Sequence, residues 1–182
     1  MQTCKTSQEG IAVSDKNKEK LIQQLKLSQP QIEEIITNHI PAQNAKSITH
    51  LVEWLRANNM PPMFQEMEHP VLIWTVEANG NSHHILWGGN DYLSIMIGSS
   101  LTPQYQEIIR AKNMQDIVLN NLQQCSRADG GHCDGCHLPP DVAGVTDVVL
   151  GREVKNLCCG MYITFDNPSA EAVECIKILL GL

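Results

Sequence analysis

The hydrophobic positions divide the chain into a helical part followed by a mixed part. Over residues 14–58 the apolar side chains recur at spacings of three and four, which is the period of an amphipathic helix. Proline and small polar residues interrupt this pattern at two places, so three helices are predicted, over 14–27, 30–40 and 47–58. Residues 1–13 are mostly small or polar and are predicted to form a flexible N-terminus.

The pattern changes to that of strands after residue 69. Segments 71–76, 85–87 and 92–97 are rich in β-branched and aromatic residues. The Asn79-Gly80 step and the glycine-rich stretch 88–91 between them are turn signals. These three segments therefore predict an antiparallel meander.

The last part of the chain combines helices with a cysteine-rich segment. Thr102 and Pro103 predict the start of a helix that reaches Leu122, although Asn113 interrupts its pattern. A glycine- and cysteine-rich segment spans 125–144, a strand or hairpin covers about 145–165, and Ser169 caps a final helix.

The predicted class is therefore α+β: an antiparallel sheet packed by helices, with N-terminal helices and a C-terminal Cys-rich lobe. Residues 14–182 are predicted to form one domain, made of a helical segment (14–62), a meander plus helix (69–124) and the Cys-rich lobe (125–182).

Composition narrows the classes of partner. With 13 basic against 20 acidic residues the net charge is −7, and the basic residues are scattered, which argues against a nucleic-acid binder. The chain has no long apolar run and no basic-then-apolar pattern at its start. We therefore expect a soluble cytoplasmic protein that binds neither nucleic acid nor membrane.

The cysteines carry the clearest chemical signal. Six of the seven lie in 125–182, and disulfides are rare in the cytosol, so metal or redox chemistry is expected. Cys125, Cys133 and Cys136 supply three thiols on one glycine-rich loop, with a CxxC step between the last two. A fourth thiol from the Cys158-Cys159 step would complete the tetrahedral sulfur set of a structural zinc.

Strand alternation is used to choose the fourth ligand. If Cys159 continues the strand that holds Ile163 and Phe165, it shares their inward face, and Cys158 points the other way. The predicted zinc ligands are thus Cys125, Cys133, Cys136 and Cys159, with Cys158 or His137 as replacements for the fourth. Cys175 lies in the final helix and is predicted to pack in the core.

Two other chemistries fit the segment Cys133-Asp134-Gly135-Cys136-His137. It matches the C-x-x-C-H pattern of c-type haem attachment, which the expected cytoplasmic location disfavours. It would also serve as a redox dithiol, which the following Pro139-Pro140 disfavours because a helix usually follows such a pair.

Candidates outside this segment are less specific. His83 and His84 point to opposite sides of a strand and are predicted to be surface residues. Trp54, Trp74 and Trp87 either line an apolar pocket or, as we favour, belong to the core. No residue is identified as catalytic.

The closing pattern resembles a known bacterial signature. Leu157-Cys158-Cys159-Gly160 and Phe165-Asp166-Asn167-Pro168, preceded by the three loop cysteines, resemble the C-terminal part of small uncharacterised proteins, often from Firmicutes. Their pattern reads Cys…Cys-x-x-Cys…Cys-Gly…Phe-x-Asn-Pro before a final helix. The resemblance covers 125–182, aligns the family's single cysteine with Cys159, and implies a metal site but no reaction. The meander is loosely similar to YdhG-like α+β domains.

Together these observations predict a binding or regulatory module for a small ligand or a protein partner, with a structural zinc. The alternative is a thiol-redox or electron-transfer protein that uses the CDGCH segment.

Overall fold

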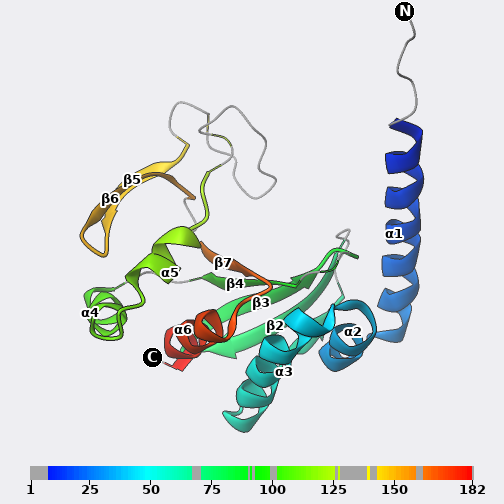
Figure 1. Ribbon diagram of the computed structural model, residues 1–182, viewed down its shortest axis with the longest axis horizontal. Helices are drawn as coiled ribbons and strands as arrows, with labels where there is room; N and C mark the ends of the chain where they lie inside the picture. Colours follow the sequence, from blue (N-terminus) through cyan, green and yellow to red (C-terminus); the bar gives the residue numbers. More distant parts are fainter. Residues whose placement is uncertain are drawn as a thin grey trace, which may run out of the picture.

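The computed structural model describes residues 8–66, 71–89, 91, 93–98, 102–125, 127, 139, 143–158 and 162–181, with side chains from residue 17 onward. Figure 1 shows how their helices and strands are arranged. In chain order these elements are α1 (Gln8–Ser28), α2 (Ile32–His39), α3 (Ala42–Ala57), β1 (Met63–Gln65), β2 (Leu72–Ala78), β3 (Asn81–Trp87), β4 (Ser94–Gly98), α4 (Pro103–Ala111), α5 (Gln115–Asn120), β5 (Val145–Val149), β6 (Arg152–Leu157), β7 (Tyr162–Asp166) and α6 (Ala170–Gly181). The predicted α+β class is confirmed.

The N-terminal helices follow the predicted pattern but begin earlier than expected. α1 begins at Gln8, ahead of the predicted start at residue 14. α3 begins at Ala42 rather than at residue 47, because the carbonyl of Pro41 accepts hydrogen bonds from the next turn, including Ala45 N at 2.9 Å. The same proline ends α2 and starts α3, so almost no loop separates them. No helix within the described residues is both long and apolar enough to cross a membrane.

The main sheet has five antiparallel strands in the order β1-β2-β3-β4-β7. The hairpin between β2 and β3 turns at Asn79 (φ 52°) and Gly80 (φ 75°), the left-handed backbone that an Asn-Gly turn provides. The predicted meander is confirmed as β2, β3 and β4. The short edge strand β1 was not predicted, since three residues are too few for a visible alternation.

One face of this sheet carries the core. Figure 1 shows α2, α3 and α6 lying together over the sheet. Trp74 and Trp87 are each 1% exposed, and Trp74 Nε1 donates to the Pro30 carbonyl at 3.1 Å. The interpretation of these two as core residues is therefore confirmed. His83 lies on the same face and is only 5% exposed, so the prediction of a surface residue is wrong for His83.

A short segment joins this sheet to a second one. The predicted long helix is broken at Asn113 (φ 56°) into α4 and α5, and residues 121–125 then run between two strands. Leu122 pairs with Ile163 of β7, whereas Gln124 pairs with Leu157 of β6. The β5–β6 hairpin is thereby linked, strand edge to strand edge, to the main sheet.

Candidate functional site

Of the four predicted zinc ligands the structure describes only Cys125. It is 4% exposed and lies at the end of the segment that joins the two sheets. Cys133, Cys136, Cys159 and the alternative ligand His137 lie outside the described residues, so the predicted set remains a prediction. Among the residues that are described, no three His, Cys, Asp or Glu side chains form a metal-binding group.

Among the described cysteines, Cys158 lies near Cys125, and it is 9% exposed. Cys125 N donates to the Asn156 carbonyl at 2.6 Å, and Cys158 N donates to the Gln123 carbonyl at 2.9 Å. Both cysteines therefore flank the paired residues Gln124 and Leu157, and strand alternation puts their side chains on the same face of the ladder. Such diagonal neighbours are about 7–8 Å apart at Cα, with both thiols free of any disulfide.

A third side chain on this ladder face has a buried polar atom. Gln123 shares the face by strand alternation, and its Oε1 is buried without a hydrogen-bond partner among the described residues. Sulfur atoms that bind one zinc ion at about 2.3 Å lie about 3.8 Å apart. The described residues supply two of the cysteines considered as ligands, Cys125 and Cys158, and no complete metal-binding group.

The alternation that favours Cys159 requires one strand running back from Phe165. β6 ends at Leu157 and β7 begins at Tyr162, and the two strands belong to different sheets. Parity counted from Ile163 therefore does not determine the face of Cys158. Cys175, in contrast, is confirmed as a core residue: it is fully buried in α6, and burial raises the pKa of its thiol to about 11.

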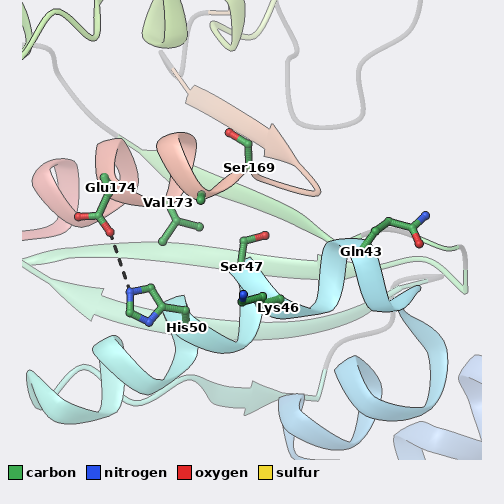
Figure 2. Close-up of a pocket in the computed structure, with 8 residues that line it drawn as sticks. Gln43, Lys46, Ser47, His50, Ser169, Val173 and Glu174 are labelled. Carbon is green, nitrogen blue, oxygen red and sulfur yellow. Dashed lines mark ion pairs between the residues drawn. The ribbon is translucent and has the colours of Figure 1, made fainter.

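A second candidate site is a groove of about 550 Å³ between α3 and the start of α6. Figure 2 shows Ser47, Lys46 and His50 on the α3 side, facing Val173 and Glu174 of α6. The complete lining is Gln43, Lys46, Ser47, His50, Ser169, Ala170, Val173 and Glu174.

Hydrogen bonds hold the two sides of this α3/α6 groove at a fixed separation. Ser47 Oγ donates to the Pro168 carbonyl at 2.7 Å, which ties α3 to the residues just ahead of α6. At the other end, Lys177 Nζ lies 2.8 Å from His50 Nε2 and 2.7 Å from Glu174 Oε1. His50 Nε2 also lies 4.0 Å from Glu174 Oε1, the ion pair that is dashed in Figure 2.

This arrangement differs from a catalytic triad although it contains a serine, a histidine and a glutamate. The Ser47 hydroxyl donates to a backbone carbonyl and not to His50. Nε2 of His50 faces Lys177 Nζ at 2.8 Å and not Ser47. A hydrolytic triad needs the histidine to take the serine proton, so this geometry favours binding over nucleophilic catalysis.

The α3/α6 groove was not predicted from the sequence. Its α3 residues recur at helical spacing, on a polar stripe beside the apolar stripe of Ile48, Leu51, Val52 and Leu55. A polar stripe of this kind usually faces solvent, so only the position of α6 reveals the groove.

No known family model, curated protein or solved structure matches the chain.

Proposed function

We propose that this protein is a non-catalytic module that binds a small ligand in the α3/α6 groove, with one structural zinc ion bound by cysteines of residues 125–158. The groove carries the proposal, because its volume of about 550 Å³ falls in the range of small-molecule sites. Its polar groups come from two different helices, which are joined by the Ser47–Pro168 hydrogen bond at one end and by the Lys177–His50 contact at the other.

The zinc would act as a structural tie and take no part in a reaction. Cys125, Cys133 and Cys136 supply three of its ligands, and we assign the fourth to Cys158 in preference to Cys159. The support for Cys158 is its burial and its place on the same ladder face as Cys125. Structural zinc sites stabilise by on the order of 10 kcal/mol in small peptides, enough to hold a loop with few apolar residues.

Metal analysis of the purified protein tests the zinc. We expect about one zinc per chain without added metal, since four cysteines form a closed tetrahedral site. Cys158→Ser should lose the metal and lower the melting temperature, whereas Cys159→Ser and the control Cys4→Ser should keep it.

A metal-free protein whose thiols cycle with dithiothreitol would replace this proposal with the thiol-redox alternative. A Soret band would replace it with covalent haem. Loss of zinc in Cys159→Ser but not in Cys158→Ser would restore Cys159 as the fourth ligand.

A fragment library screened by two-dimensional amide NMR tests the α3/α6 groove. Bound fragments should shift amide signals of both α3 and α6 residues that line it. Ala170→Trp should abolish these shifts, because Ala170 is exposed in the lining and a tryptophan there fills the space without disturbing the core. Shifts that survive Ala170→Trp would locate the binding elsewhere.

A further inference from the structure

We infer that the ligand of the α3/α6 groove is a small organic monocarboxylate, whose carboxylate binds the Lys46 ammonium while its apolar body lies against α6. This inference rests on the proposed function, since it names the chemical class of ligand for the same groove.

The first argument is the charge balance of the lining. Glu174 is paired with Lys177, whose Nζ lies 2.7 Å from Glu174 Oε1 and 2.8 Å from His50 Nε2. Lys46 has no ion pair with any described residue and is the one unpaired charge among the lining residues. With Glu174 paired to Lys177, which lies outside the lining, Lys46 leaves the groove one positive charge without a partner among the described residues, in a chain whose net charge is −7.

Second, a single lysine favours an anion with one negative charge. A phosphate or polyphosphate group is usually held by several cations or by an arginine fork, and the lining contains neither. A single ammonium point charge matches a single carboxylate. The monoanion is thus favoured over a nucleotide or a phosphosugar.

The third argument is the apolar part of the lining. Ala170 of α6 and the methylene stem of Lys46 are exposed and provide carbon surface beside the charge, whereas Val173 is fully buried. A short alkyl or aromatic group attached to the carboxylate covers this surface, whereas a fully polar acid would leave it exposed to water.

Paired acids and amides of the same shape test this inference. Hexanoate and benzoate are titrated into the protein, followed by amide NMR, and hexanamide and benzamide are titrated in the same way. We expect the acids to shift groove residues and to bind roughly tenfold more tightly than the amides, the worth of one charge-assisted hydrogen bond. Raising the salt concentration should weaken the acids alone.

Lys46→Gln removes the charge and keeps most of the side-chain length. It should lower the affinity for the acids to that for the amides. The matched control is Lys155→Gln, an exposed lysine of β6 that does not line the groove, and it should leave both affinities unchanged.

The possible failures are distinguishable. Equal binding of acids and amides in the groove would overturn the carboxylate assignment and leave the proposed small-ligand site standing. Acid binding that Lys46→Gln does not weaken would also overturn the assignment. If neither the four compounds nor the fragment library shifts the amide signals of groove residues, both the carboxylate assignment and the proposed small-ligand site are overturned.

Discussion

His83 is a histidine buried on the helix-covered face of the main sheet. Its Nδ1 is buried and has no hydrogen-bond partner among the described residues. Burial lowers the pKa of His83, and the charge of His84 lowers it further, while the Ala78 carbonyl and Glu77 oppose these effects. The folded protein therefore keeps this ring neutral at pH values where an exposed imidazole takes up a proton.

Acid should destabilise the fold through His83. As the pH falls through about 6.5, the unfolded chain binds a proton at this residue before the folded chain does, so the free energy of unfolding decreases. The decrease ends once the pH passes the lower pKa of the folded state. Urea unfolding at a series of pH values should show this slope in the wild type and a smaller slope in His83→Leu.

The control for this slope is His50→Leu, a histidine of α3 whose side chain is 63% exposed. A slope that is unchanged in His83→Leu, or that falls equally in both variants, would contradict the assignment to His83.

At the scale of elements, Asn167 joins β7, β4 and the start of α6. Its Oδ1 accepts from Leu93 N at 3.0 Å, its Nδ2 donates to the Asp91 carbonyl at 3.2 Å, and its backbone N donates to the Leu93 carbonyl at 2.9 Å. Its φ of 44° lies in the left-handed region, where asparagine is better tolerated than most residues. The helix that forms one side of the α3/α6 groove therefore starts from a fixed point.

Asn167→Ala should lower the free energy of unfolding by about 2–4 kcal/mol, because it removes two side-chain hydrogen bonds and strains the backbone. Asn167→Gly removes the same hydrogen bonds without the strain, so it should be the less damaging substitution by about 1 kcal/mol. Denaturant unfolding of both variants measures the two effects separately. An alanine variant as stable as the wild type would show that neither the side-chain hydrogen bonds nor the backbone strain affects the free energy of unfolding.

Elements were predictable where apolar periodicity was long or a turn signal was specific. The isoleucines of α2 and the Asn79-Gly80 turn are clear in the sequence, and both appear as expected. The assignment of β6 and β7 to different sheets was not predictable, because both segments have the pattern of strands and the sequence between them contains no proline. The division of strands between two sheets is a long-range pairing that local pattern does not encode.

At the scale of the whole molecule, the α+β class followed from the order of helical and strand patterns, but neither candidate site was predictable in full. The α3/α6 groove depends on contact between elements more than 100 residues apart, as in the bond from Ser47 to Pro168. The proximity of Cys125 to Cys158 depends on the pairing of Gln124 with Leu157. Cysteine spacing predicted a cluster of thiols. The pairing of Gln124 with Leu157 is what places Cys125 and Cys158 on one face of the ladder.

The segment 121–125 has a consequence for how this chain tolerates change in length. The N–H of Gln123 bonds to Tyr162 on one side, and its carbonyl receives the N–H of Cys158 on the other, so a single residue serves both sheets. Deleting one residue here would leave at most one sheet correctly aligned and would rotate Cys125 away from Cys158. Homologous chains should therefore conserve the length of this stretch more strictly than its amino acids.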